Sequence, residues 1–244
     1  MAQWLSEYLY SHRGLHTSAG APENSLAAFT ASIDAGFGIE LDVQAASDGA
    51  PMVFHDFSLE RLTVAKGPLA AQSASALGSL KLGNSNETIP TLAATLELVD
   101  GRAPLLIEIK TPPRARIGPL EACIAGLLEG YQGRFAVQSF NPDSMAWFVD
   151  NAPGFVRGQI AANFISRPDR SMWWARRLAW SKLWSCQLSR PHFVSYQVLA
   201  LPCPATRRVR AQGIPLLCWT VRTAAQRARA ELYADSYIFE GFLP

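Results

Sequence analysis

Short apolar runs that favour β-strands alternate with longer stretches that favour helices along the whole chain, and this alternation is the strongest constraint on the fold. Repeated β-α units of this kind are typical of a parallel sheet covered by helices. Eight strands are predicted, at Tyr8–His12, Gly38–Val43, Pro104–Lys110, Phe135–Phe140, Val156–Ala162, His192–Gln197, Pro215–Val221 and Ser236–Glu240. Seven helices are predicted between them, at Ser25–Ala35, Leu92–Asp100, Leu120–Gly130, Pro142–Asn151, Ser171–Cys186, Pro204–Gln212 and Thr223–Tyr233. This pattern favours an α/β fold of the TIM (β/α)8-barrel type over an open sheet.

The length agrees with this architecture. A chain of 244 residues suits a single barrel domain over residues 1–244, because barrels of about 250 residues fold as one domain. Residues 57–90 are rich in Ser, Gly and Ala, with a short amphipathic piece at Ser73–Leu80, which predicts a small insertion that shapes a pocket at the barrel mouth. Only Gly-Phe-Leu-Pro follows the last strand, so the last helix is expected to be missing and replaced by the N-terminal segment Met1–Tyr8.

Composition excludes few partners but sets useful limits. The net charge of +2 gives no reason to expect a nucleic-acid partner. The four cysteines form no metal-ligand or disulfide pattern, which favours reduced packing residues and a reducing compartment. Residues Met1–Leu9 lack the features of a secretory signal, so a cytoplasmic location is expected. No stretch is long and apolar enough to span a bilayer, and peripheral membrane contact stays open without being favoured.

One strand breaks the regular alternation. Pro51–His55 reads as a strand, yet only Ser47–Ala50 separates it from the preceding strand region. A parallel partner would need a crossover of a dozen or more residues, so an antiparallel hairpin turning near Asp48-Gly49 is predicted. Facing residue numbers then sum to about 97, which places His55 opposite Asp42.

Charged residues at the ends of apolar strands are the candidates for chemistry. In barrel enzymes the C-terminal strand ends meet on one face, so we expect the pairs His12-Arg13, Glu40/Asp42, Glu108/Lys110 and Trp219/Thr220 to converge there. Glu40 and Asp42 share one side of a strand, and Glu108 ends the next parallel strand. A single carboxylate there is commonly solvated or paired with Lys110 or Arg13. Three together predict one divalent cation, Mg²⁺ or Ca²⁺.

Histidines and nitrogen donors complete the predicted site. His12 and His55 are two of only four histidines, and a lone strand-end histidine is often structural, but two beside carboxylates favour a general acid and a general base. Arg13 and Lys110 suit phosphate oxygens and also suit the neutralisation of the acidic cluster. Asn24 is expected to reach the same mouth and to contact the substrate, and Glu23 beside it is expected to cap the following helix or to order the loop.

Aromatic residues leave two interpretations open. Trp219 at a strand end fits either an apolar wall for a substrate or core packing. The predicted helix Ser171–Cys186 mixes four tryptophans with basic residues, a pattern that fits a membrane-surface helix. The outer helix of a barrel buries an apolar stripe of the same kind, and this second interpretation is the favoured one.

The same residues resemble the glycerophosphodiester phosphodiesterase family, and the likeness runs through most of the chain. Its signatures occur in order and at the family's spacing. They are His12-Arg13-Gly14, Pro22-Glu23-Asn24-Ser25, Ala28-Phe29, Glu40-Leu41-Asp42-Val43, Asp48-Gly49, Val53-Phe54-His55-Asp56, Leu62-Thr63, Ile89-Pro90-Thr91-Leu92, Leu106-Ile107-Glu108-Ile109-Lys110, Gln138-Ser139-Phe140 and Trp219-Thr220-Val221.

The resemblance implies a TIM barrel that cleaves a small glycerophosphodiester to glycerol 3-phosphate and an alcohol. It further implies a divalent ion on Glu40, Asp42 and Glu108, an acid/base pair of His12 and His55, and phosphate contacts from Arg13 and Lys110. Departures from the family pattern occur at Ala46-Ser47, before Asp48-Gly49, and near the last strand, at Ser236 and Phe239-Glu240. Two alternatives stay open. One is a phospholipase or lysophospholipase D activity on lipid substrates at a membrane surface, and the other is a non-catalytic barrel that binds a phosphate ligand.

Overall fold

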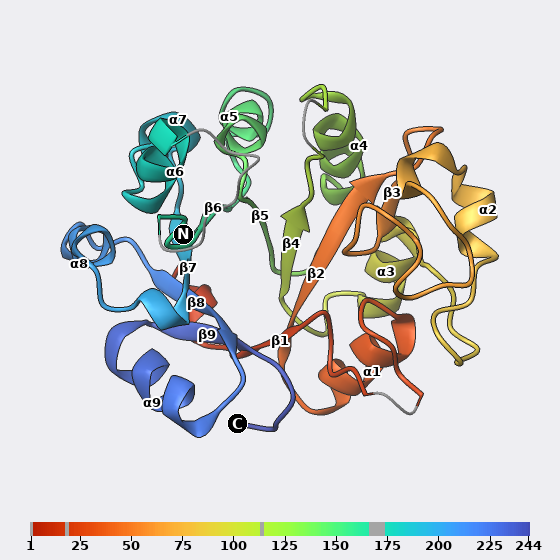
Figure 1. Cartoon of the computed structure of the whole chain (residues 1–244), viewed down its shortest axis with the longest axis horizontal. Coiled ribbons are helices and arrows are strands. Elements are labelled where there is room, and N and C mark those ends of the chain that lie inside the picture. The colour runs from red at the N-terminus through yellow and green to blue at the C-terminus, as the bar shows by residue number, and fades with distance from the viewer. Residues whose placement is uncertain (1, 18–19, 113–114, 166–173) are drawn as a thin grey trace. The chain divides into compact units, whose positions relative to one another are not determined.

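The computed structural model describes residues 2–17, 20–112, 115–165 and 174–244 (Figure 1). The chain divides into two compact units, one formed by Tyr10–Ala136 and the other by Met1–Leu9 together with Val137–Pro244. The expectation of a single domain over residues 1–244 stays a prediction.

The unit Tyr10–Ala136 is built around strand β2 (Gly38–Ala45), which pairs with three other strands. Strands β1 (Tyr10–His12) and β4 (Leu105–Ile109) run parallel to it, with His12 opposite Glu40 and Asp42 opposite Glu108. Strand β3 (Pro51–Val53) is antiparallel to the last three residues of β2. Strand β1 pairs with β2 only as far as Glu40, and β3 pairs with β2 from Val43 onward. The pairing with β3 therefore begins just after the acidic residues of β2.

The predicted hairpin exists, but its register differs by one residue from the prediction. Val43 faces Val53 and Ala45 faces Pro51, so facing numbers sum to 96 rather than 97. The Ala46 N–H donates to the Ala50 carbonyl at 3.0 Å, so the pairing continues to these residues and the turn contains three residues, 47–49, rather than two. Phe54 therefore lies opposite Asp42, and its N–H donates to the Asp42 carbonyl at 3.0 Å. The prediction of His55 opposite Asp42 is wrong, and His55 follows the end of β3.

Three of the four described α-helices of this unit begin after a serine or threonine cap. The four helices are α1 (Leu26–Asp34), α2 (Ala74–Gly78), α3 (Leu92–Val99) and α4 (Pro119–Leu128), with a 3₁₀ turn η2 at Leu69–Ala71. The hydroxyl oxygens of Ser25, Ser73 and Thr91 accept backbone N–H groups in the first turns of α1, α2 and α3. These oxygens satisfy donors that the helix itself leaves unpaired, so each helix start is fixed locally.

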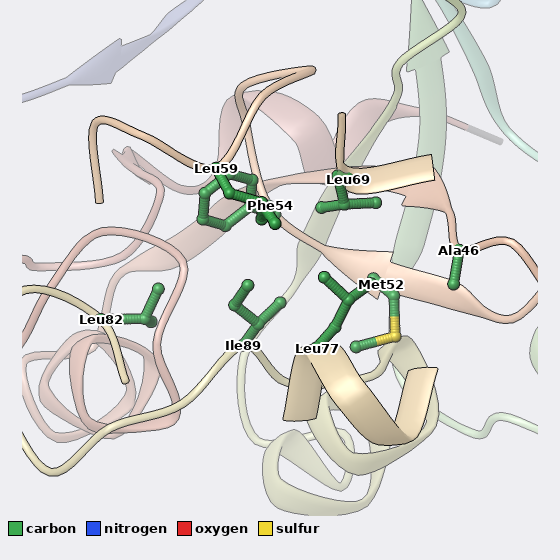
Figure 2. Packing of buried hydrophobic residues seen from close by; sticks show 8 residues of the cluster. All are labelled: Ala46, Met52, Phe54, Leu59, Leu69, Leu77, Leu82 and Ile89. Carbon is green, nitrogen blue, oxygen red and sulfur yellow. The ribbon is translucent and has the colours of Figure 1, made fainter. Parts of the chain in front are cut away.

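The predicted insertion has a small hydrophobic core of its own (Figure 2). Phe54 and Met52 from the hairpin pack with Leu77 of α2 and with Ile89 at the end of the insertion. The remaining members are Ala46, Leu59, Leu69 and Leu82. This core attaches the insertion to the hairpin that carries His55, so the two segments are held together by apolar packing.

The second unit alternates parallel strands with helices. Its strands are β5 (Phe135–Ser139, which begins in the first unit), β6 (Arg157–Ala161), β7 (Phe193–Gln197), β8 (Leu216–Val221) and β9 (Ser236–Phe239), paired in that order. Its helices are α5 (Pro142–Asn151), α6 (Trp174–Ser181), α7 (Cys186–Ser189), α8 (Pro204–Ala211) and α9 (Ala224–Tyr233), with 3₁₀ turns η1 (Gln3–Ser6) and η3 (Val198–Ala200). All eight predicted barrel strands are present.

One predicted helix is wrong in extent. The helix expected at Ser171–Cys186 is two pieces, because α6 ends at Ser181 and α7 begins only at Cys186. Leu183 between them has a φ of 59°, a left-handed backbone that ends a helix. Residues 171–173, including Trp173, lie outside the described residues.

The chain ends close to the predicted pattern. After β9 the described residues contain no further helix. The N-terminal segment forms η1, Leu5 within it is fully buried, and the Ser236 hydroxyl of β9 donates to the Tyr8 carbonyl. These contacts attach the N-terminal segment to β9, as expected for a segment that replaces the missing helix. None of the described helices has the length and apolar character needed to span a bilayer.

Candidate active site

Three carboxylates meet where β2 and β4 lie side by side. Glu40 and Asp42 lie two residues apart on β2 and therefore point to the same side, and Asp42 faces Glu108 across the parallel pairing. One oxygen from each of the three lies within 4.8 Å of the others. All three residues are buried, with exposed fractions of 2% for Glu40, 1% for Asp42 and 8% for Glu108. Three buried carboxylates this close form an oxygen donor set suited to a hard divalent cation.

Electrostatics of the cluster divide the three acids. Burial, together with repulsion from Asp42 and Glu108, raises the pKa of Glu40 well above its usual range. Burial also raises the pKa of Glu108. Burial alone would raise the pKa of Asp42 too, but the charges of Lys110 and Arg13 outweigh it and hold that pKa below its usual value. Three acids thus face two nearby cations, Lys110 and Arg13, and the raised pKa values show that full ionisation of the cluster is unfavourable without further positive charge. A bound divalent ion would supply that charge.

Lys110 lies directly against the cluster. Its Nζ is 3.1 Å from Glu108 Oε1 and 3.5 Å from Asp42 Oδ1. The nearby charges of these two acids outweigh burial and raise the pKa of Lys110, so the amine stays charged. The structure therefore brings Lys110 to the predicted site, where it pairs with two of the three predicted metal ligands.

His12 and Arg13 approach from the end of β1. His12 Nε2 lies 4.0 Å from Glu40 Oε2. Arg13 has a φ of 58°, and this left-handed backbone turns its N–H toward Glu40 Oε2, to which it donates at 3.2 Å. The Arg13 Nε lies 3.3 Å from Asp42 Oδ2, and its Nη1 donates to Glu23 Oε1 at 2.6 Å. Arg13 is thus held between two carboxylates at the cluster.

The Asn24 side chain both donates a hydrogen bond to Asp42 and accepts one from it. The Asn24 side-chain amide donates to Asp42 Oδ2 at 2.9 Å, while the Asp42 backbone N–H donates to the Asn24 side-chain oxygen at 3.3 Å. Asn24 is 1% exposed, and its φ of 59° is a conformation that asparagine tolerates well. The sequence predicted a substrate contact for Asn24. In the structure its side chain fixes the orientation of an acidic residue of the cluster.

His55 is presented on the turn that follows β3. The Gln44 side-chain amide donates to the carbonyls of Phe54 and Asp56, at 2.7 and 2.8 Å, and so holds both neighbours of His55. His55 Nδ1 lies 2.6 Å from Asp56 Oδ1. Burial alone would raise the pKa of Asp56, but hydrogen bonds from Arg61 and His55 outweigh it and lower that pKa. An ionised Asp56 accepts only, so the Nδ1 of a neutral His55 carries the proton and Nε2 keeps its lone pair.

Arg61 connects the two loops that carry Arg13 and His55. Its guanidinium donates to Glu23 through two nitrogens, each at 2.8 Å, and its Nε and Nη2 donate to Asp56. Glu23 in turn binds Arg13, and Asp56 binds His55. An unbroken ionic chain therefore runs from Arg13 through Glu23, Arg61 and Asp56 to His55.

Sequence reasoning missed two members of this arrangement. Gln44 and Arg61 end no apolar run, and neither carries a charge pattern that marks a site. Glu23 was expected to cap α1 or order the loop, yet it binds Arg13 and Arg61. The only available signal for Arg61 is its distance of five residues from Asp56 in a segment without regular structure, and such spacing alone predicts no contact.

Trp219 belongs to the second unit. It lies in β8, where its ring contacts Phe140 edge to face at 5.4 Å between centroids, and its indole N–H donates to the Ser195 carbonyl at 3.2 Å. These contacts hold Trp219 by packing and by one hydrogen bond. Its predicted role as a substrate wall stays a prediction.

A pocket of about 630 Å³ opens beside Glu23. One side is formed by the loop between β1 and α1 and the other by the insertion. Its lining comprises His16, Thr17, Gly20, Pro22, Glu23, Leu62, Leu82, Gly83, Asn84 and Ser85. Glu23 lines this pocket and also binds Arg13, which contacts Asp42 of the acidic cluster. Only Arg13 therefore separates Glu23 from the cluster.

Comparison with known proteins decides the family. The profile of the glycerophosphoryl diester phosphodiesterase family matches residues 12–238. The chain belongs to the glycerophosphoryl diester phosphodiesterase family. A glycerophosphodiester phosphodiesterase of Bacillus altitudinis is 32% identical over 66% of this chain and 69% of its own length. One from Caldanaerobacter subterraneus is 34% identical over 64% of this chain and 67% of its own length.

Solved structures agree on the fold. An Oleispira antarctica phosphodiesterase, solved in complex with the product sn-glycerol-3-phosphate, matches with a TM-score of 0.77 and 22% identity, over 95% of this chain and 92% of that chain. This glycerophosphodiester phosphodiesterase has the TIM (β/α)8-type barrel fold, and the prediction of fold and family is confirmed. The family and the named relatives identify the chain as a phosphoric diester hydrolase.

Proposed function

We propose that this phosphodiesterase hydrolyses small glycerophosphodiesters to glycerol 3-phosphate and an alcohol with the help of one divalent cation, Mg²⁺ or Ca²⁺, held by Glu40, Asp42 and Glu108. The observation that carries the proposal is the set of three buried carboxylate oxygens within 4.8 Å of one another. Its charge excess fits a hard cation, and the bound product in the Oleispira antarctica relative supports the substrate class. When bound, the cation would stabilise negative charge that develops on the phosphoryl oxygens.

The histidines have different surroundings, and these support different roles. His55 is held in one tautomer by Asp56, so its Nε2 is the nitrogen that can accept a proton from the attacking hydroxyl. His12 Nε2 lies 4.0 Å from Glu40 Oε2 at the edge of the acidic cluster, and this position supports the donation of a proton from His12 to the departing alkoxide oxygen. One proton is thus taken from the nucleophile and one is returned to the leaving group.

Cations of the site act on the phosphate and on the carboxylates together. Arg13 and Lys110 already pair with Glu23, Asp42 and Glu108, and each retains further N–H groups for a phosphate oxygen. Asn24 keeps Asp42 in place while these charges rearrange. The pocket beside Glu23 is the space that we assign to the alcohol group of the substrate.

The test is an assay of glycerol 3-phosphate release over a panel of glycerophosphodiesters with Mg²⁺, Ca²⁺ or EDTA. We expect release with one of the ions and loss of release in EDTA that is reversed by adding the ion back. Full activity in EDTA after thorough dialysis would remove the metal from the proposal. The appearance of a cyclic phosphate before glycerol 3-phosphate would identify the glycerol 2-hydroxyl as the nucleophile, and its absence at early times would favour water.

A further inference from the structure

Charge is distributed unevenly along the sequence. Residues 151–230, here called the basic segment, contain thirteen Lys and Arg residues and a single acidic residue, Asp169, which lies outside the described residues. The rest of the chain contains nine basic and nineteen acidic residues. The net charge of +2 therefore conceals a strongly cationic segment. Acidic residues beyond the segment pair with three of its arginines, Arg210, Arg222 and Arg227. The remaining charge excess attracts anionic partners.

Large apolar side chains are exposed within the basic segment. Trp174 at the start of α6 is 64% exposed, Trp184 between α6 and α7 is 55% exposed, and Leu188 of α7 is 49% exposed. A single exposed apolar residue is ordinary on a protein surface. Two exposed tryptophans in one short stretch are less so, because the indole ring is best accommodated at a boundary between water and an apolar phase.

Basic side chains lie on the same and on adjoining elements. The exposed Arg176 places its guanidinium carbon 4.4 Å from the centroid of the Trp180 ring. Arg208 of α8 donates from Nη2 to the Lys182 carbonyl at 2.9 Å, which joins α8 to the turn after α6. The Trp184 N–H donates to the Ala179 carbonyl at 2.9 Å, so this turn folds back on α6, and α6 and α7 lie next to each other (Figure 1). Cations and exposed tryptophans therefore share one group of connected elements.

We propose that this group of elements docks the protein on the surface of an anionic phospholipid bilayer. The docking surface, here called the α6–α8 surface, consists of Trp174, Arg176, Lys182, Trp184, Leu188 and Arg208. Its cations would lie among the lipid phosphates, and its apolar side chains would enter the boundary between headgroups and acyl chains. The association is peripheral, since none of the described helices is suited to spanning the bilayer.

The exposed apolar residues decide between a bilayer and a nucleic acid. Both partners carry phosphates that attract arginine and lysine. The backbone of a nucleic-acid duplex offers no apolar phase for Leu188 or for two tryptophans, and phosphate contacts do not require them. A bilayer buries these side chains in addition to binding the cations. The combination therefore favours a lipid surface.

The test is sedimentation of the full-length protein with vesicles of phosphatidylcholine alone and of phosphatidylcholine mixed with phosphatidylglycerol. We expect binding only to the mixed vesicles, and its loss at high salt because exposed charges are screened. The double variant W174A/W184A is expected to lower the partition coefficient about tenfold or more. The double variant R176Q/R208Q is expected to lower it about fivefold for each cation removed, which corresponds to roughly 1 kcal/mol per basic residue at the surface.

Matched controls come from the insertion, where Val64 is 92% exposed and Lys66 is also exposed. The variants V64A and K66Q remove an exposed apolar side chain and an exposed cation there, and we expect wild-type binding from both. Thermal melting of every variant shows whether it is folded. Equal binding of wild type to both kinds of vesicle overturns the proposal, and so does wild-type binding by a folded W174A/W184A. Tighter binding to a DNA duplex of random sequence, unaffected by W174A/W184A, would instead identify a nucleic-acid surface. None of these outcomes depends on the catalytic roles proposed above.

Discussion

The two compact units of this phosphodiesterase use charge in opposite ways. In Tyr10–Ala136, each of the three cations nearest the site contacts two carboxylates: Arg13 contacts Glu23 and Asp42, Lys110 contacts Asp42 and Glu108, and Arg61 contacts Glu23 and Asp56. Among the described residues of Val137–Pro244, the basic side chains are mostly exposed, and acidic partners from the C-terminal part of the chain pair with three of them, as Asp235 does with Arg210. Paired and buried charges hold a site in one geometry, whereas an unpaired excess at the surface attracts a partner.

The largest expected effect on stability is that of removing Lys110. Its side chain is 13% exposed and lies against two buried carboxylates. In Lys110→Met these acids lose their cation, so we expect the free energy of unfolding to fall by about 3–5 kcal/mol in EDTA. Added Mg²⁺ or Ca²⁺ should recover part of this loss, because a bound cation replaces the missing charge. Urea denaturation with and without the ion measures both values, and a loss under about 1 kcal/mol in EDTA would contradict the buried pairing.

The next effect concerns catalysis in the same unit. His12→Ala and His55→Ala should each lower kcat at least about 10²-fold, the usual cost of losing a general acid or base. His192 is the matched control from the other unit, because it is a histidine whose Nδ1 accepts the backbone N–H of Arg157 at 3.1 Å. We expect His192→Asn to retain nearly wild-type kcat. Steady-state kinetics of glycerol 3-phosphate release gives all three values, and a near wild-type kcat from both site variants would remove the acid/base assignment.

The parts of the molecule on which these two predictions rest differ in how well the sequence predicts them. The strands and the positions of Glu40, Asp42 and Glu108 follow from period-two patterns and from the rule that parallel strands end on one face. The hairpin register does not follow, because one additional residue in the loop moves Phe54 to the place expected for His55. The Leu183 break between α6 and α7 is also invisible to periodicity, since leucine gives no sign of a left-handed backbone.

The ionic chain around Arg61 is a different kind of omission. Glu23, Asp56 and Arg61 meet through two loops and an insertion, and no local pattern specifies such a meeting. The buried insertion core that brings these segments together becomes visible only in three dimensions (Figure 2). Sequence patterns predict residues on regular elements well, and they predict side chains that orient those residues from loops poorly.

A smaller effect is expected from Arg61 itself. Arg61→Gln breaks the connection between the loops of Arg13 and His55 but removes no group from the acidic cluster. Because Arg61 is 46% exposed, the cost in stability should stay near 1 kcal/mol or below. Loosened positioning of His55 should nevertheless lower kcat about tenfold. Arg61→Lys keeps the charge without the planar fork, so we expect only partial recovery. Equal kcat for wild type and Arg61→Gln would show that the chain has no positioning role.

The pH dependence of stability tests the same chain. Burial would raise the pKa of Asp56 and of Glu23, but hydrogen bonds from Arg61, together with His55 at Asp56 and Arg13 at Glu23, outweigh it and lower each pKa. A carboxyl whose folded pKa is depressed stabilises the protein above its unfolded pKa of about 4, and this contribution is lost as the pH falls through the folded pKa. The difference in unfolding free energy between wild type and Arg61→Gln should therefore shrink from pH 6 toward pH 3, as a denaturation series would show. A difference that grows on acidification would contradict the assignment.

The smallest effect on stability is expected from an exposed arginine of the basic segment, in contrast to the large effect expected from the buried Lys110. Arg207 lies exposed on α8 between a buried Thr206 and the exposed Arg208, in a segment with an excess of positive charge. Its replacement by Gln should change the free energy of unfolding by no more than about 0.5 kcal/mol, and the sign should be stabilising at low salt because like-charge repulsion is reduced. The gain should disappear at high salt, where exposed charges are screened. A loss of several kcal/mol would mean that the cations of this unit are structural as well, and the division between a paired and an attracting charge distribution would fail.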